Sequence, residues 1–198
     1  MPSAMAESTR RKYRGEIAAG YEARRRPQVK WKAEDRIVRE MLSELPPETV
    51  LLDIPVGTGR FIPFYEERGF RVIGLDVSDD MLAHARRKIA APARITVEVG
   101  DIFAIDLPDQ AVDVAVCIRL LNLIGATDME MALRELQRVT RSMIICNLRV
   151  WHPQTRYRRP QRREDFTASL LPGWQIAEDR EIHESDFRMF RLCAGSTS

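Results

Sequence analysis

Residues 51–61 read Leu-Leu-Asp-Ile-Pro-Val-Gly-Thr-Gly-Arg-Phe, and this stretch decides the fold. An apolar run ends in an acid, and a turn that contains Gly57 and Gly59 then leads into a helical pattern. A glycine-containing turn between a first strand and a first helix is typical of doubly wound α/β folds, which bind nucleotides at that point. The glycines allow the backbone to approach a ligand closely, because no Cβ stands in the way.

The spacing of these glycines narrows the choice of ligand. A dinucleotide fingerprint requires a third glycine three residues after Gly59, and this position is Ile62. Asp53 stands just before the turn, where its charge would repel a pyrophosphate. Both observations disfavour NAD and FAD. They favour a ligand that carries an ammonium group and a sulfonium.

The chain outside this turn alternates between short apolar runs and helical patterns, which predicts a parallel sheet covered by helices on both faces. The expected strands are residues 49–54, 71–76, 94–99, 112–118 and 142–148, and the expected helices are 11–25, 30–44, 59–68, 79–90, 127–139 and 163–171. Residues 174–183 and 187–193 indicate an antiparallel hairpin at the sheet edge. We expect a disordered N-terminus over 1–10 and one domain over 11–198, with a helical lid at 11–45 and a Rossmann-like core at 49–198.

Acids follow three successive strands, at Asp53, Asp76 and Asp101. Asp76 lies 23 positions after Asp53 (76 − 53), close to the separation of about 20 at which an acid reaches the ribose hydroxyls. A carboxylate there accepts charge-assisted hydrogen bonds from both hydroxyls of a diol. Ser78 is predicted to cap the next helix. Asp101, followed by apolar residues, suits an adenine ring and its amino group. Each acid alone is more often a turn or capping residue.

The stretches 53–59, 74–81, 100–103 and 117–122 together resemble the successive motifs of the class I S-adenosylmethionine-dependent methyltransferases. The similarity is strongest to the small bacterial group that includes quinone-biosynthesis enzymes, and it spans roughly residues 49–148. The resemblance implies a seven-stranded Rossmann-like doubly wound sheet with an antiparallel last strand. It also implies S-adenosyl-L-methionine as the cofactor, and no metal site is predicted.

The resemblance assigns the parts of the cofactor to particular residues. Asp76 would bind the ribose, Met81 and Ile102 would pack against the adenine, and Asp101 would meet its amino group. The turn at 57–59 would hold the methionine portion. The full set of implied contacts is Asp53, Pro55, Gly57, Thr58, Gly59, Arg60, Asp76, Val77, Met81, Asp101, Ile102, Phe103, Cys117, Ile118 and Arg119. The family usually has glycine where this chain has Pro55, so the turn must form without a positive φ at that residue.

The chemistry requires alignment of an acceptor with the methyl group more than it requires a strong base, because the cofactor carries the activated leaving group. Cys117 ends an apolar strand and is interpreted as a pocket wall, not a nucleophile. No catalytic residue is assigned. His84 and His183 are weaker candidates for a base than His152, which follows the fifth strand. The candidate acceptor contacts are Tyr21, Asn122, His152, Arg158 and Arg159.

The basic residues gather at 10–14, at 24–26 and at 156–163, although the net charge is only +2. Because arginine forks suit carboxylates and phosphates, the third cluster is consistent with an anionic small-molecule acceptor. A solvated loop with helix-end charges is an equal alternative. RNA or protein acceptors are an alternative that is not favoured, and a non-catalytic cofactor-binding or regulatory subunit is another. No run reaches the roughly 18 apolar residues of a membrane span. We therefore expect a cytoplasmic protein with reduced thiols, and its oligomeric state stays open.

Overall fold

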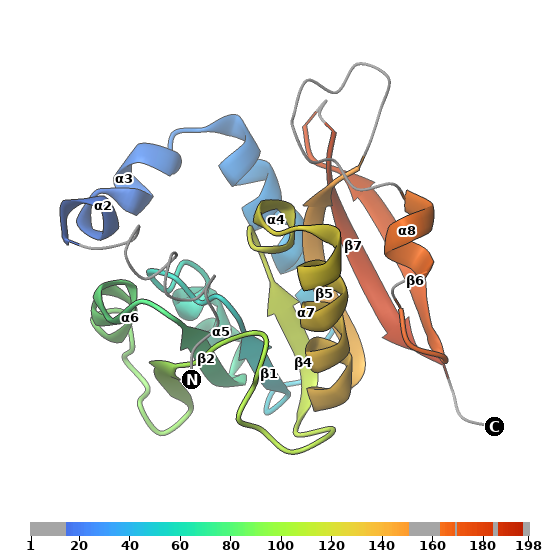
Figure 1. The fold of residues 1–198 in the computed structure, drawn as a ribbon. Helices are drawn as coiled ribbons and strands as arrows, with labels where there is room; N and C mark the ends of the chain where they lie inside the picture. The colour runs from blue at the N-terminus through green and yellow to red at the C-terminus, as the bar shows by residue number, and fades with distance from the viewer. Residues whose placement is uncertain (1–14, 151–162, 169, 184–185, 196–198) are drawn as a thin grey trace.

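The computed structural model describes residues 15–150, 163–168, 170–183 and 186–195. They form a seven-stranded sheet in the order β3-β2-β1-β4-β5-β7-β6 (Figure 1). Strands β1 to β5 are parallel, and β7 is antiparallel to both of its neighbours. The strands are β1 (Val50–Asp53), β2 (Arg71–Asp76), β3 (Ile95–Val99), β4 (Val112–Cys117), β5 (Thr140–Arg149), β6 (Trp174–Glu181) and β7 (Phe187–Ala194). The predicted fold class is confirmed, including the antiparallel last strand.

Helices cover both faces of the sheet, as the apolar character of its strands requires. One core contains Leu51 of β1 together with apolar side chains of α4 (Val29–Leu42), α5 (Ile62–Arg68) and α6 (Asp79–Arg86). The opposite core contains Leu52 together with side chains of α7 (Ala126–Val139) and α8 (Arg163–Ala168). Since neighbouring strand residues point to opposite faces, the two leucines serve two different cores.

The short helices α2 (Gly15–Ala19) and α3 (Tyr21–Arg25) lie beside α6 (Figure 1). The backbone N–H of Gly15 donates to Asp80 Oδ2 at 2.7 Å, which links α2 to the start of α6. The sequence predicted one helix over 11–25, whereas the structure divides its described part at Gly20. Glycine is a poor helix former, which explains why the division falls there.

Two helix boundaries differ from the sequence prediction for physical reasons. Helix α5 begins at Ile62 instead of residue 59, because Gly57 and Gly59 have φ angles of 58° and 72°, outside the helical region. Helix α6 ends at Arg86 instead of residue 90. Beyond it, the backbone N–H groups of Ala90 and Ala91 donate to Glu66 Oε1, so they bond outside the helix.

None of the helices that the structure describes combines the length and apolar character that a bilayer crossing requires. All three cysteines are free thiols. Cys117 and Cys146 are buried, and Cys193 is partly exposed. This agrees with the prediction of reduced thiols.

Candidate cofactor and active site

A cavity opens where the carboxyl ends of the parallel strands face helices α3 and α4. Its empty volume is about 1000 Å³, including the part open to solvent. The implied cofactor contacts that line it are Asp53, Pro55, Gly57, Thr58, Arg60, Asp76, Val77, Met81, Asp101, Ile102, Phe103, Ile118 and Arg119.

Two implied cofactor contacts, Gly59 and Cys117, do not line the cavity. A Cβ on Gly59 would stand 2.5 Å from Ile62 Cδ1 and 3.0 Å from the Ala85 backbone, so this glycine permits close packing of α5 and α6. Cys117 is fully buried in the core that α7 covers. Burial raises the pKa of its thiol well above the ordinary value, which keeps it protonated. The interpretation of Cys117 as a cavity wall is wrong, and its interpretation as a non-nucleophile agrees with the structure.

The glycine turn and the end of β2 are joined through Asp76. Its Oδ2 accepts from the backbone N–H of Gly57 at 3.0 Å, and its Oδ1 accepts from that of Ser78 at 2.9 Å. Burial raises the pKa of Asp76 to about 6, although these backbone donors act in the lowering direction. The backbone N–H of Val77 also acts on Asp76 in the lowering direction, and a carboxylate offers about four lone-pair sites, so the group keeps acceptor capacity for a ribose hydroxyl.

The turn itself matches the sequence expectation. Gly57 has a left-handed φ, and Pro55, which also lines the cavity, has no positive φ. Ser78 caps α6 by accepting from the backbone N–H of Met81 at 3.3 Å, as predicted. The glycine therefore provides the conformation that a side chain at position 57 would resist.

Asp53 lies on the cavity floor and is 2% exposed. The hydroxyl of Tyr65 donates to its Oδ2 at 3.1 Å. Burial, which outweighs this hydrogen bond, raises the pKa of Asp53 to about 8. A buried carboxylate without a bound cation is costly, whereas an ammonium group beside it would restore the charged form.

The third strand end supplies an apolar slot with one acid at its edge. Ile102 is buried and Phe103 is partly exposed, and both line the cavity together with Met81. Asp101 is partly exposed, and its Oδ1 accepts from the backbone N–H of Phe103 at 3.1 Å. These side chains form the kind of surface against which a flat ring packs.

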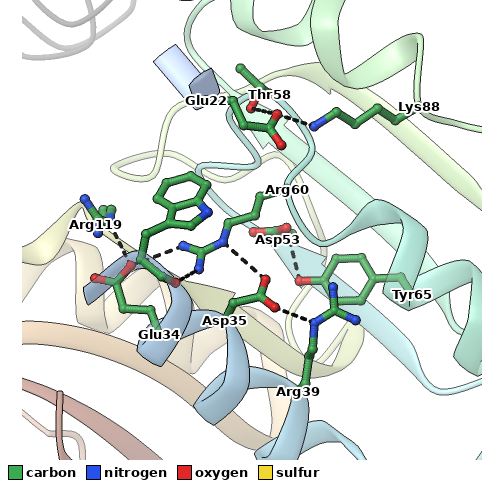
Figure 2. Close-up of polar contacts among 11 residues, drawn as sticks. Glu22, Glu34, Asp35, Arg39, Asp53, Thr58, Arg60, Tyr65, Lys88 and Arg119 are labelled. Atoms are coloured by element: carbon green, nitrogen blue, oxygen red, sulfur yellow. Dashed lines mark hydrogen bonds and ion pairs between the residues drawn. The ribbon is translucent and has the colours of Figure 1, made fainter. Parts of the chain in front are cut away.

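A buried ion cluster at the opposite end of the cavity was missed by sequence reasoning (Figure 2). Glu34 of α4 is 1% exposed, and its Oε2 accepts from Arg60 Nη1 at 3.1 Å and from Arg119 Nε at 2.7 Å. Its Oε1 accepts from Asn147 Nδ2 at 3.3 Å. A single carboxylate thus joins α4 to the glycine turn, to the end of β4 and to β5.

A signal for Glu34 is present in the sequence. Trp31, Glu34, Val38 and Met41 recur at helical spacing, and all four are buried. An acid on the apolar stripe of an amphipathic helix is costly unless it is paired. Its position therefore predicts a buried partner, although not the identity of that partner.

Arg60 follows the glycine turn, but its hydrogen bonds go to α4. Its Nε donates to Asp35 Oδ1 at 3.4 Å, and its Nη2 donates to the backbone carbonyl of Trp31. Its guanidinium carbon lies 3.6 Å from the centre of the Trp31 ring, which is a stacked cation–π contact. Arg60 therefore fixes Trp31, itself a cavity residue, over the turn.

A second link to the turn comes from α3. Glu22 Oε2 accepts from Thr58 Oγ1 at 3.3 Å and from Lys88 Nζ, so it contacts both the turn and the segment after α6 (Figure 2). Tyr21 lines the cavity and contacts Trp31 edge to face, with ring centres 6.2 Å apart. Tyr21 therefore lines the cavity, and its contact with an acceptor stays a prediction.

The remaining expected residues lie elsewhere. Asn122 lies in the 3-10 helix η1 (Leu121–Leu123), and its buried Oδ1 has no hydrogen-bond partner among the described residues. His84 lies on α6 and His183 is exposed after β6, and neither lines the cavity. His152, Arg158 and Arg159 lie outside the described residues.

Comparison with known proteins adds to this geometry. A family model described as a methyltransferase domain matches residues 51–143. The malonyl-(acyl-carrier protein) O-methyltransferase of Serratia marcescens is 42% identical over 95 residues, which cover 48% of this chain and 35% of that protein. The demethylmenaquinone methyltransferase of Thermobifida fusca is 37% identical over 102 residues, which cover 49% of this chain and 42% of that protein. Residues 51–143, slightly less than half of the chain, are thus similar to methyltransferase domains.

Solved structures agree with the fold of this chain. A magnesium protoporphyrin IX methyltransferase from Synechocystis, solved with bound SAH, has a TM-score of 0.67 at 18% identity, covering 84% of this chain and 83% of that chain. SpnF, a (4+2)-cyclase, has a TM-score of 0.71 at 16% identity, and the match covers 83% of this chain and 82% of that chain. The cyclase illustrates that this fold alone does not determine a reaction. The match also covers only about a third of the length of the Serratia relative.

The residues of this cavity fit S-adenosyl-L-methionine, which the sequence also predicted as the cofactor. Asp76 has acceptor capacity suited to a ribose diol, and the buried Asp53 carboxylate suits an ammonium group. The apolar slot around Ile102 suits an adenine ring. A Cβ on Gly57 would project into this region, 3.7 Å from Met81 Cε, so glycine keeps the space beside the slot open.

Proposed function

We propose that this protein transfers a methyl group from S-adenosyl-L-methionine to a small acceptor that enters the same cavity. The observation that supports this most strongly is the convergence of Asp53, Asp76 and Asp101, from three successive strand ends, on one cavity. Tyr21, Trp31 and Leu123 also line the cavity, and we expect the acceptor to approach beside them.

When bound, the cofactor supplies a methyl group on a positively charged sulfur. The chain's own residues would hold the nucleoside through Asp76 and Asp101 and hold the ammonium group through Asp53. Trp31 and Tyr21 would limit the access of water from the side of α3 and α4. Alignment of this kind can supply about 7–11 kcal/mol of a barrier. No histidine among the described residues lines the cavity, which favours an acceptor that needs no strong base.

We further propose that the acceptor is a small anionic molecule. The support is the arginine-rich stretch 156–163, together with Arg119 in the cavity wall. Relatives named for a malonyl-(acyl-carrier protein) O-methylation and for a phosphatidylethanolamine N-methylation show that the methylated atom varies among similar chains. The acceptor class must therefore be tested directly.

Two measurements test the proposed function. Calorimetry with S-adenosylhomocysteine should show binding, and Asp76→Ala should abolish it. Methyl transfer from a cofactor with an isotopically labelled methyl group should then be followed across carboxylates, phenols, quinols and amines. Absence of cofactor binding to the wild-type protein would refute the proposal. Tight binding with transfer to no acceptor would instead favour a non-catalytic subunit.

A further inference from the structure

The ion cluster around Glu34 contains more cations than anions. Arg39 and Arg60 contact Asp35, and Arg60 and Arg119 contact Glu34. Three guanidinium groups are therefore opposed by two carboxylates, which leaves a net charge of +1 (3 − 2). Arg39 and Asp35 are 37% and 29% exposed and are screened by solvent, whereas Arg60 and Arg119 share the buried carboxylate of Glu34. The poorly screened excess therefore lies with Arg60 and Arg119. A monoanion beside the cluster would balance its charge.

The hydrogen bonds show which arginine can receive that anion. Arg60 uses Nε, Nη1 and Nη2 for contacts with α4, and Arg39 does not line the cavity. Arg119 lines the cavity and uses only its Nε, which donates to Glu34. Within the part of the chain that the structure describes, neither Nη of Arg119 has an acceptor. Its outer edge therefore keeps two parallel donors.

The backbone of Arg119 also indicates a functional position. Its φ is 64°, in the left-handed region that a side chain of this size rarely adopts. Its backbone N–H donates to Asn147 Oδ1 at 2.7 Å, and its guanidinium carbon lies 5.2 Å from the Trp31 ring centre. A strained residue held at both its backbone and its side chain is typical of ligand-binding sites. The side chain is 17% exposed, so a ligand can reach it.

We propose that Arg119 is a carboxylate-binding residue of this cavity, oriented by Glu34 and Asn147. Two coplanar donors match the two oxygens of a carboxylate, and the single excess charge matches a monoanion. The inference rests on the proposed function, because the carboxylate belongs either to the methionine portion of the cofactor or to the methyl acceptor. It assigns the recognition of a carboxylate to Arg119 in the described cavity wall.

The two sources are distinguished by ligands that differ only in the group concerned. 5′-Methylthioadenosine has the nucleoside and the sulfur of S-adenosylhomocysteine but lacks its amino-acid carboxylate. Calorimetry of both ligands would be performed on the wild-type protein, Arg119→Gln and Arg119→Lys. Ligand-observed NMR with benzoate and octanoate, in the presence of saturating S-adenosylhomocysteine, would report an acceptor carboxylate. Arg39→Gln is the matched control, because it removes an arginine of the same cluster outside the cavity.

Loss of a bidentate charge-assisted contact should weaken binding about 10- to 100-fold. If the cofactor supplies the carboxylate, Arg119→Gln loses affinity for S-adenosylhomocysteine and keeps its affinity for 5′-methylthioadenosine. If the acceptor supplies it, S-adenosylhomocysteine affinity is unchanged and benzoate or octanoate binding is lost. Arg119→Lys should retain part of the affinity as a point charge without the fork.

Unchanged binding of all four ligands in Arg119→Gln, equal to that in Arg39→Gln, would overturn the inference while leaving the proposed function intact. Failure of the wild-type protein to bind either nucleoside would refute the proposed function. The carboxylate probes, tested then without the nucleoside, would still decide the role of Arg119. Unfolding midpoints and circular dichroism of each variant would show whether a loss reflects binding, since Glu34 keeps Arg60 and Asn147 as partners in Arg119→Gln.

Discussion

The two ends of the cavity are built in different ways. At the nucleoside end, Asp76 is held by backbone N–H groups only 19 and 2 positions away. At the other end, Glu34 contacts arginines 26 and 85 positions away and an asparagine 113 positions away. The first end is a property of consecutive strand–turn–helix units, whereas the second exists only when α4 packs onto the sheet. Removal of Glu34 should therefore affect folding, whereas removal of Asp76 should affect binding.

The largest effect is expected for Glu34→Ala. The change leaves two buried guanidinium groups without their shared acceptor, and the loss of one partner of a buried ion pair typically costs about 3–5 kcal/mol. Urea unfolding should show this loss of stability. Asp35→Ala on the same helix is the control, because Asp35 is 29% exposed and its pairs should be worth about 1 kcal/mol or less. Equal losses of unfolding free energy in Glu34→Ala and Asp35→Ala would show that burial of Glu34 does not make its ion pairs more important than those of Asp35.

A smaller effect, confined to binding, is expected for Asp76→Asn. The amide keeps the volume of the side chain but weakens the acceptor for a ribose diol by about 1.5–3 kcal/mol, or roughly 10- to 150-fold in affinity. Because the nucleoside is common to both ligands, S-adenosylhomocysteine and 5′-methylthioadenosine should lose affinity equally by calorimetry. A loss of affinity limited to S-adenosylhomocysteine would show that Asp76 contacts the amino-acid portion of the ligand and not its ribose.

Asp53 lies between the two ends and makes cofactor binding depend on pH. With a pKa of about 8, its carboxyl group is largely neutral at pH 7, and a cationic ligand must draw it into the charged form. The affinity for S-adenosyl-L-methionine should therefore rise between pH 6.5 and 8, by at most about tenfold per pH unit. Asp53→Asn should bind more weakly and show no rise in this window.

The same titration has the opposite sign for folding. A carboxyl group whose pKa is higher in the folded protein stabilises it at low pH, and this contribution is lost as pH rises through about 8. The free energy of unfolding of the ligand-free protein should fall as the pH rises to about 8. The free energy of unfolding of Asp53→Asn should fall less over the same pH interval. A parallel decline in both proteins would exclude Asp53 as the cause.

The smallest effect is expected for Glu22→Gln. The Glu22–Lys88 pair is partly exposed, with 31% and 28% of the two side chains accessible, and such pairs are worth about 1 kcal/mol or less. Global stability should change little, while hydrogen exchange in α3 should become faster. Lys88→Gln should reproduce this result. Unchanged exchange in both variants would show that Glu22 does not hold α3 on the turn.

The sequence predicted the nucleoside end well, because its signals are local. Asp53, Asp76 and Asp101 each follow an apolar run, and parallel strands bring their carboxyl ends to one edge. Gly57 was recognised for the same reason. Gly59 was misinterpreted, because whether a glycine faces a ligand or a neighbouring helix depends on packing that spacing does not encode.

The other end could not be read in the same way. Glu34 lies far from its partners in the sequence, and its periodic position predicts only that some partner exists. Arg119 was included for its place after the fourth strand, but nothing in the residue type predicts a left-handed backbone, which glycine or asparagine would favour. Such conformations are imposed by tertiary contacts, here with Asn147 and Glu34.

The place of β7 has a consequence for synthesis on the ribosome. This strand pairs with β5 on one side and with β6 on the other, and its Met189, Phe190 and Leu192 side chains are fully buried. While the nascent chain is still shorter than about 194 residues, β5 is paired only with β4, and β6 lacks the strand that pairs with it. The two strands beyond β5 can therefore join the sheet only after residue 194 has left the exit tunnel, and until then the β7 side of β5 is an unpaired strand edge.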